Sequence, residues 1–196
     1  MTAYPLSLGT SAAFPSPIGG APTKQGEVRM IRSLHAWDES GGAPISYGFS
    51  GVTLASSLAG VVRGDRFQGR FRCGAGLLDG AEGDTLVVDE AASLSLVIGP
   101  HRLNSVGALT LHRLVTPQFY RIAIRCEEFA EGPDAVKRVN LAFYSDPRYC
   151  AGDDFRLDRL DISQIPMPSL YLEGEDGEPV INAKLQSLDR VSDPEN

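Results

Sequence analysis

Two short strings that pair serine with glycine are the first places where this sequence could carry nucleophilic chemistry. They are Asp38-Glu39-Ser40-Gly41-Gly42 and Gly48-Phe49-Ser50-Gly51. A serine nucleophile needs a histidine base and an orienting carboxylate, and a nucleophile elbow needs Gly-x-Ser-x-Gly ahead of a helix. The one histidine before Ser40 is His35, which is only five residues away in the sequence. No helical pattern follows Gly51, as a nucleophile elbow would require. We therefore predict that the chain is not an enzyme, and we assign no catalytic residue and no cofactor.

Metal ligation is also weakly indicated, because the residues that bind metals are scattered along the chain. The histidines lack the i to i+4 spacing or the neighbouring cysteines of a zinc site. The aspartate run could offer oxygens to calcium, yet it lacks the EF-hand spacing, and a solvated face is favoured. The cysteines are odd in number and widely spaced, which predicts reduced thiols and no disulfide. The residues considered are His35, His101 and His112, Asp146, Asp153, Asp154, Asp158 and Asp161, and Cys73, Cys126 and Cys150.

An arginine-bearing strand is the clearest candidate for binding a partner. Residues 66–73 alternate, which places Arg66, Arg70 and Arg72 on one face and apolar side chains on the other. Guanidinium groups bind carboxylates and phosphates. The arginines could therefore hold an acidic partner surface, an anionic saccharide or the chain's own acidic end, or face solvent with cross-strand ion pairs. The tripeptide Arg63-Gly64-Asp65 directly precedes this strand and is expected to form a turn. Gly64 would supply a positive φ, and Asp65 would cap the turn.

Aromatic residues suggest a second kind of binding site. Exposed aromatics and loop carboxylates are usual in carbohydrate-binding β-domains. Core packing is the interpretation that we favour for these side chains, since aromatics supply much of any β core. The candidates are Trp37, Tyr47, Tyr144 and Tyr149.

The elements that must position these residues are short strands. Alternation with a period of two, with turn signals about every ten residues, favours an all-β, antiparallel β-sandwich or jelly-roll-like domain. The segments are 27–37, 45–49, 66–73, 86–88, 94–98, 108–115, 119–126, 139–143, 155–162 and 169–172. Amphipathic helices, which a parallel α/β sheet requires, are not indicated. The predicted core contains Phe67, Phe71, Tyr120, Ile122, Ile124, Leu141 and Phe143.

The two ends of the chain differ from its middle, which predicts three parts. Residues 1–26 are rich in proline and glycine and form an extended arm, whose expected anchors on a partner are Leu6, Leu8, Phe14 and Ile18. Residues 27–172 form the β-domain. Residues 173–196 form an acidic tail with a short helix over 182–191, because Leu185 and Leu188 are spaced to share a helix face.

Composition narrows the class of function. A net charge of −7 argues against nucleic-acid binding, which needs a basic surface. The N-terminus has no basic region followed by an apolar one, and no apolar run is long enough to cross a membrane. We expect cytoplasmic synthesis, with release in a particle. The predicted function is a structural or assembly protein, such as a head, spike or tail component of a phage-like virion, with protein subunits as partners. The alternatives are a carbohydrate-binding module for a surface glycan and an enzyme with a dispersed site.

Overall fold

The chain is an all-β protein, and its described residues contain twelve strands and one short 3-10 helix. This computed structural model describes residues 29–32, 44–74, 84–148 and 160–191. The strands are β1 (Arg29–Arg32), β2 (Pro44–Ser56), β3 (Arg66–Gly74), β4 (Asp84–Asp89), β5 (Ser93–Ile98), β6 (His101–Ser105), β7 (Leu109–Val115), β8 (Tyr120–Cys126), β9 (Phe129–Glu131), β10 (Arg138–Ser145), β11 (Met167–Glu173) and β12 (Pro179–Arg190), and the 3-10 helix is η3 (Ile162–Gln164).

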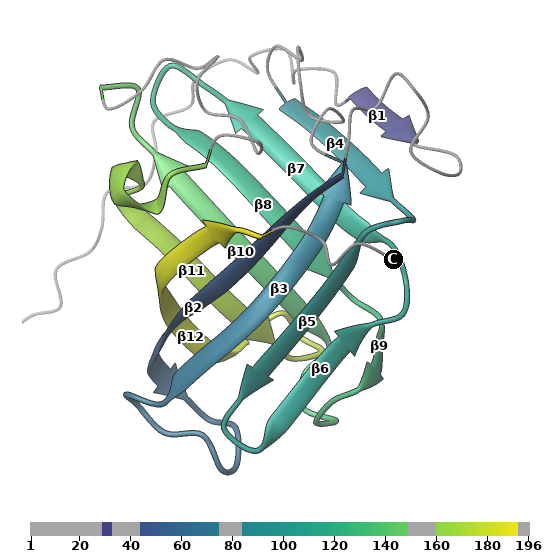
Figure 1. The fold of residues 1–196 in the computed structure, drawn as a ribbon, viewed down its shortest axis with the longest axis vertical. Coiled ribbons are helices and arrows are strands. Elements are labelled where there is room, and N and C mark those ends of the chain that lie inside the picture. The colour runs from purple at the N-terminus through teal and green to yellow at the C-terminus, as the bar shows by residue number, and fades with distance from the viewer. Residues whose placement is uncertain (1–28, 33–43, 75–83, 149–159, 192–196) are drawn as a thin grey trace, which may run out of the picture.

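The strands form one curled sheet in the order β1-β4-β7-β8-β10-β11-β12-β2-β3-β5-β6-β9. Neighbours are antiparallel except β1 and β4, which are parallel. Figure 1 shows β2, β3, β5 and β6 (the front layer) lying over the back layer of β7, β8, β10 and β11, with β12 at the corner. The all-β prediction is confirmed. The predicted sandwich or jelly roll is not confirmed, because both layers belong to one continuous sheet that forms a half-barrel.

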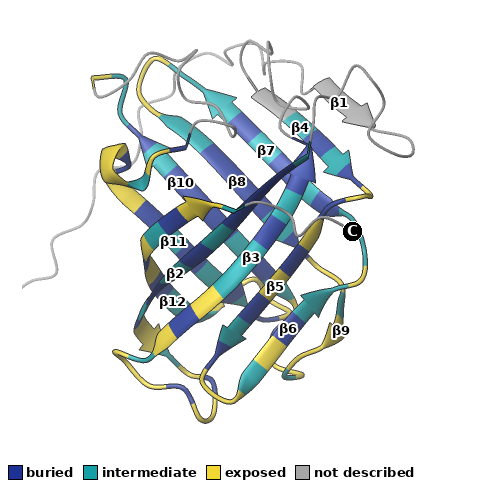
Figure 2. Cartoon of the chain, viewed as in Figure 1, coloured by how far each residue is buried: buried dark blue, intermediate teal, exposed yellow. Residues whose placement is uncertain are grey.

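The core fills the space between the two layers. Buried positions alternate with more exposed ones along most strands (Figure 2). Six of the seven predicted core residues are at most 3% exposed, and Tyr120 is half-buried against the same core. The predicted strands 108–115 and 119–126 are found as β7 and β8, which form a hairpin in which Val115 faces Tyr120. The period of two therefore gave the correct inward face of these strands.

Two glycines allow the front layer to contain large rings. Gly51 of β2 faces Phe67 of β3, and Gly69 of β3 faces Phe49 of β2. A Cβ on Gly51 would meet the Phe67 ring and the Lys184 backbone oxygen, and a Cβ on Gly69 would meet the Phe49 ring. Each ring thus occupies the space that a side chain on the opposite strand would need.

The prediction of a helix over 182–191 is wrong, and so is that of an acidic tail from 173. Glu173 ends β11, a turn follows, and β12 lies in the middle of the sheet between β11 and β2. Leu185 and Leu188 both face the core although they are three residues apart. The register with β2 shifts between Leu185 and Ser187, and the extra residue of this β-bulge imitates helical spacing.

Two further segments of the sequence prediction are only partly covered by the described residues. The predicted strand 155–162 ends in η3 instead, because the Asp161 carboxylate accepts the Ser163 N–H and caps that turn. The predicted strand 27–37 contains β1, and its other residues lie outside the described ranges. Residues 1–26 and 192–196 also lie outside them, so the structure does not test the predicted arm.

Candidate interaction surfaces

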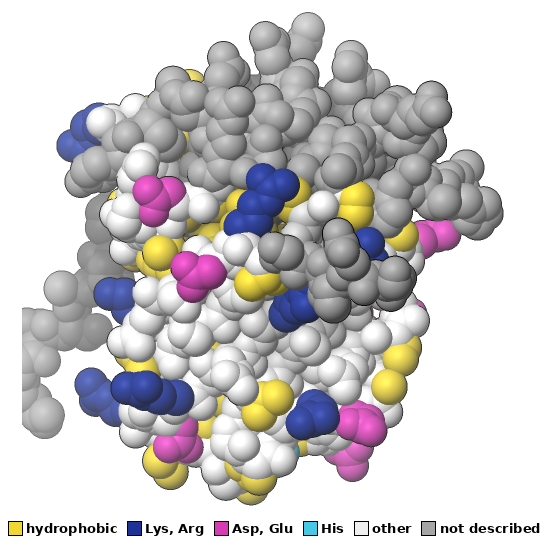
Figure 3. Space-filling view, in the orientation of Figure 1, with side chains coloured by type: hydrophobic (Ala, Val, Ile, Leu, Met, Phe, Trp, Pro, Cys, Tyr) yellow, Lys and Arg dark blue, Asp and Glu magenta, His cyan; other side chains and the backbone are white. Residues whose placement is uncertain are grey.

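The outward side of β3 carries the three arginines singled out from the sequence. Phe67, Phe71 and Cys73 are buried on the inner side. Arg66 is exposed and Arg70 and Arg72 are half-buried on the outer side, as the alternation predicts. We call this outer side, with the strands beside it, the arginine face. Figure 3 shows it as mostly polar side chains and backbone, with Lys and Arg side chains distributed over it.

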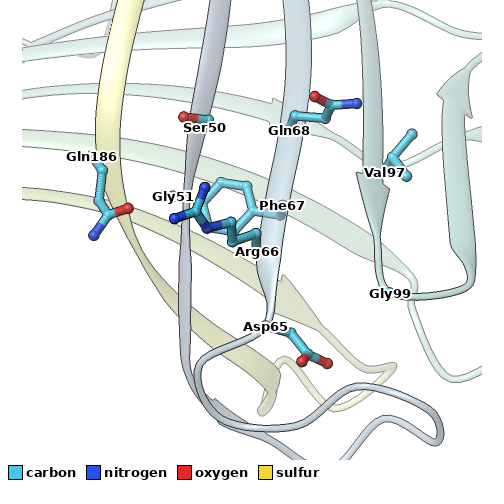
Figure 4. Close-up of a pocket in the computed structure, with 9 residues that line it drawn as sticks. All are labelled: Ser50, Gly51, Asp65, Arg66, Phe67, Gln68, Val97, Gly99 and Gln186. Atoms are coloured by element: carbon cyan, nitrogen blue, oxygen red, sulfur yellow. The ribbon is translucent and has the colours of Figure 1, made fainter.

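A hollow of about 570 Å³ lies on the arginine face, across β12, β2, β3 and β5 (Figure 4). We call it the polar hollow. Its outward lining consists of small or polar side chains, and a second hollow that shares Ser50, Gln68 and Val97 extends it. The Ser50 and Ser187 hydroxyls are 2.7 Å apart and form a hydrogen bond across β2 and β12. The polar hollow is lined by Ser50, Gly51, Asp65, Arg66, Phe67, Gln68, Val97, Gly99 and Gln186.

The turn before β3 closes one end of the polar hollow. Gly64 has a φ of 93°, which favours glycine, and the Asp65 carboxylate accepts the Val62 N–H at 2.8 Å. Both roles were predicted from the tripeptide 63–65. Asp65 therefore stabilises the turn, and Arg63 at its tip is exposed.

The surroundings of the polar hollow are basic. On one side of the hollow, Val52 of β2 pairs with both Arg66 of β3 and Lys184 of β12. On the other side, Val97 of β5 pairs with Arg102 of β6. The arginine face also includes Arg63, Arg70 and Arg72, whereas its acids include Asp65, Asp189 and, on β9 opposite Asn104 of β6, Glu131. Cations therefore outnumber acids on this face of a protein whose net charge is −7.

Exposed acidic side chains cluster at one end of the back layer, where β8 and β11 end. The linker after β8 and the turn between β11 and β12 meet there, because Lys137 N–H donates to the Glu173 backbone oxygen. Arg138 also joins the two segments through Glu127 at 2.8 Å and Glu173 at 3.0 Å. We call the exposed acids here the acidic end: Glu127, Glu128, Asp134, Glu175, Asp176 and Glu178.

A second, apolar hollow of about 480 Å³ lies at the other end of the back layer. It is formed where the β7–β8 turn, the end of β10 and the start of β11 meet. Phe119 is 40% exposed and Met167 is 62% exposed, and with Pro166 they form one exposed apolar patch. The apolar hollow is lined by Gln118, Phe119, Tyr144, Ser145, Asp146, Arg148, Pro166 and Met167.

Polar contacts fix the rim of the apolar hollow. The Thr116 hydroxyl accepts the Phe119 N–H at 3.0 Å and donates to the Phe119 backbone oxygen at 2.8 Å, which holds the β7–β8 turn. Arg148 donates to both carboxylate oxygens of Asp146, at 2.9 and 2.6 Å, and lowers the pKa of Asp146 to about 2. The Arg121 guanidinium lies 5.9 Å from the centre of the Tyr144 ring.

Of the aromatic residues predicted for carbohydrate binding, Tyr144 alone is found at a hollow among the described residues. Tyr47 is 3% exposed and packs on Phe71, so it belongs to the core, as the favoured interpretation of these side chains predicts. Trp37 and Tyr149 lie outside the described residues. Sequence reasoning missed Phe119 and Met167, although the Thr116-Pro117-Gln118 turn and the prolines beside Met167 place both at strand ends.

The residues considered for catalysis or metal binding have other roles where the structure describes them. His101 donates from Nε2 to the Ala59 backbone oxygen at 2.8 Å. Within the described ranges no group of three His, Cys, Asp or Glu side chains could hold a metal ion. Cys73 and Cys126 are free and buried, and burial raises the pKa of both thiols. Ser40, His35, Cys150 and Asp153, Asp154 and Asp158 lie outside the described residues.

The predicted arm anchors Leu6, Leu8, Phe14 and Ile18 also lie outside the described residues. Of the residues predicted to bind a partner, the structure describes Arg66, Arg70 and Arg72, on the arginine face. In the part of the chain that is described, no helix is long and apolar enough to span a membrane.

Comparison with known proteins finds no family model, no curated protein and no solved structure that matches this chain.

Proposed function

We propose that this chain is a non-enzymatic assembly protein that joins other protein subunits, and that the apolar hollow is one of its contact surfaces. The composition of that hollow carries the proposal. Phe119, Tyr144 and Met167 are exposed or half-buried around it, and Arg121 and Arg148 lie at its edge. Aromatic residues, Met and Arg are the types enriched at protein interfaces, and exposed apolar patches mark docking sites.

The N-terminal arm belongs to the same proposal. Its prolines restrict the free chain, so docking of Leu6, Leu8, Phe14 and Ile18 on a neighbouring subunit costs relatively little conformational entropy. Deleting residues 2–22 should leave the thermal midpoint of the domain nearly unchanged and abolish incorporation into the assembly. A truncated chain that assembles as well as the full chain would show that the arm is passive. A phage-like virion remains the particle we propose.

Met167→Glu tests the apolar hollow directly. A tagged full chain expressed in its native cells should elute in an assembly well above its own mass of 21.0 kDa. Met167→Glu should elute near the monomer mass, because a charge buried at the contact is strongly unfavourable. Its thermal midpoint should match that of the wild type, because Met167 is exposed.

Val106→Glu is the matched control, because Val106 is 63% exposed and is not among the residues that line the apolar hollow. It should elute with the wild type. The proposal fails if the wild-type chain is a monomer in its cells, or if Met167→Glu and Val106→Glu assemble equally well.

A carbohydrate-binding module is the second candidate, and Tyr144 favours it. This tyrosine lies in the apolar hollow beside an amide and two charged side chains, a combination suited to sugars. Two results together would favour this function over the first. The chain would bind on a glycan array and lose that binding in Tyr144→Ala, and both Met167→Glu and Val106→Glu would assemble like the wild type.

A further inference from the structure

We propose that the polar hollow on the arginine face is the docking site for a second copy of this chain, which inserts its acidic β11–β12 turn. This inference rests on the proposed assembly function and names one contact within it. Three observations support it: the charge of the hollow, the charge of the turn and the shapes of the two.

The receiving surface is basic and open. Arg66 lines the polar hollow, and Lys184 and Arg102 each lie two strands from it, on either side and on the same face of the sheet. Ser50 and, in the adjoining hollow, Gly48 and Ser187 occupy outward positions with a small side chain or none, which leaves room above the strands. Gln68 and Gln186 are exposed at its sides and can donate hydrogen bonds to carboxylates.

Asp65 is the one acid that lines the polar hollow, and it opposes an acidic ligand. Its carboxylate already accepts the Val62 N–H in the turn. Four exposed cations lie around it on the same face, namely Arg63, Arg66, Arg102 and Lys184. Positive charge therefore dominates the region that an incoming turn would enter.

The inserted part is a short, preformed projection. The Gly174 N–H donates to the Glu178 backbone oxygen at 2.9 Å, and Gly177 has a φ of 81°. The Asp176 carboxylate accepts the Glu178 N–H at 3.1 Å, which fixes the turn from within. Glu175 and Glu178 are exposed and carry the charge outward. A rigid turn loses little entropy on docking.

Charge complementarity selects this occupant. Two copies of a chain with net charge −7 repel each other unless opposite charges meet at the contact. The acidic end and the arginine face are the described regions where acids and cations collect on separate surfaces. Pairing one with the other brings opposite charges together, which gives the contact its orientation.

Sedimentation of the purified full chain at low and high salt tests the contact. The wild type should self-associate at low salt and dissociate at about 1 M salt, where screening acts within about 3 Å. Glu175→Lys/Glu178→Lys should weaken self-association about tenfold or more, because it places like charges opposite each other. Both substitutions make the net charge of the chain less negative. If general repulsion between copies alone controlled self-association, this variant would therefore associate more strongly than the wild type, not less.

A second variant and a mixture make the test specific. Arg66→Glu/Lys184→Glu should also be monomeric, and a mixture of the two reversed variants should associate again, because their contact charges are opposite. Glu90→Lys/Glu128→Lys is the control: it changes the net charge equally at two exposed acids that are neither on the β11–β12 turn nor among the residues that line the polar hollow, and it should have a smaller effect.

Three results would overturn this inference: a monomeric wild type, reversed variants that associate like the wild type, or a mixture that stays monomeric. The proposed function would survive each of them if the chain still elutes in a large assembly from cells and Met167→Glu removes it. Conversely, a Met167→Glu chain that still elutes in the large assembly would refute the proposed use of the apolar hollow and leave the proposed self-contact unaffected.

Discussion

The inner surfaces of the front and back layers fill the core with different kinds of side chain. In the front layer β2 and β3 use rings, and the Phe71 ring centre lies 5.4 Å from that of Tyr47 and 6.2 Å from that of Phe49. The inner side of β5 and β6 is aliphatic, with Leu94, Leu96, Ile98 and Leu103 buried. The back layer buries mostly aliphatic side chains: Leu109, Leu111, Ile122, Ile124, Val139, Leu141, Leu170 and Leu172, with Phe143.

Glycine accompanies the rings and is absent from the other layer. The described strands β7, β8, β10, β11 and β12 contain no glycine, whereas Gly48, Gly51, Gly69 and Gly74 lie in β2 and β3. Large side chains concentrated on two strands need empty positions opposite them. The comparison teaches that the front layer depends on specific pairs, and the back layer on evenly distributed volume.

Removing one ring from each layer should give the largest effects. Phe71 and Phe143 are both fully buried, and replacing either with alanine should cost about 3 to 5 kcal/mol of unfolding free energy. Phe71→Ala should cost about 1 kcal/mol more, because it also loses two ring contacts.

Urea denaturation measures the difference between these variants. Leu54→Ala, at a position 45% exposed, is the control and should stay within about 0.5 kcal/mol of the wild type. A Phe71→Ala effect below about 1 kcal/mol would contradict its place in the core. Equal costs for Phe71→Ala and Phe143→Ala would show that ring contacts add nothing in the front layer.

Filling a glycine position should have the next largest effect. Gly51→Ala should destabilise the protein by about 1 to 3 kcal/mol, because the new Cβ would meet the Phe67 ring and a backbone oxygen that cannot move alone. Gly132→Ala is the control, since its nearest neighbour would be Leu103 at 3.6 Å, an ordinary contact. Thermal midpoints of the two variants should differ by several degrees. A Gly51→Ala midpoint equal to that of Gly132→Ala would contradict the ring-over-glycine packing.

Alternation predicted the strands whose two sides have different environments. Residues 66–73 and 120–126 have large apolar side chains at every second position, so their buried sides could be read from the sequence. Alternation did not predict β12 as a strand, because the bulge between Leu185 and Ser187 adds one residue and reverses which positions face the core. It also could not show that both layers belong to one curled sheet, since that depends on pairings between strands distant in sequence.

The candidate surfaces were predictable to different degrees. The outward placement of Arg66, Arg70 and Arg72 follows from one strand, and sequence reasoning found it. The apolar hollow required a turn, the end of β10 and the start of β11 to meet, and Phe119 and Met167 are far apart in the chain. The acidic end likewise combines residues 127–134 with the turn after β11, which looked like part of a tail.

Polar contacts at the start of β10 should contribute less than the core of either layer. Arg138→Met removes the hydrogen bonds to Glu127 and Glu173 and should cost about 1 kcal/mol. Lys137→Met, at the exposed neighbouring position, should change the unfolding free energy by less than about 0.5 kcal/mol. Urea denaturation that shows the same stability for both variants would mean that Arg138 contributes no more than an ordinary surface cation.

The ion pair beyond the other end of β10 should have the smallest effect, visible as a titration. Hydrogen bonds from the Arg148 guanidinium, and then from its N–H, lower the pKa of Asp146 to about 2 from the ordinary 3.8. Because the folded pKa is below the unfolded one, the stabilisation is complete above about pH 4 and is lost as the pH falls towards 2. NMR titration of the carboxyl carbons should show this midpoint, and Arg148→Ala should raise it towards 3.8. The pKa of Asp161, which the Ser163 hydroxyl lowers first, is the control in the same spectra and should not move. An unchanged Asp146 midpoint in Arg148→Ala would show that Arg148 does not hold this carboxylate at the rim of the apolar hollow.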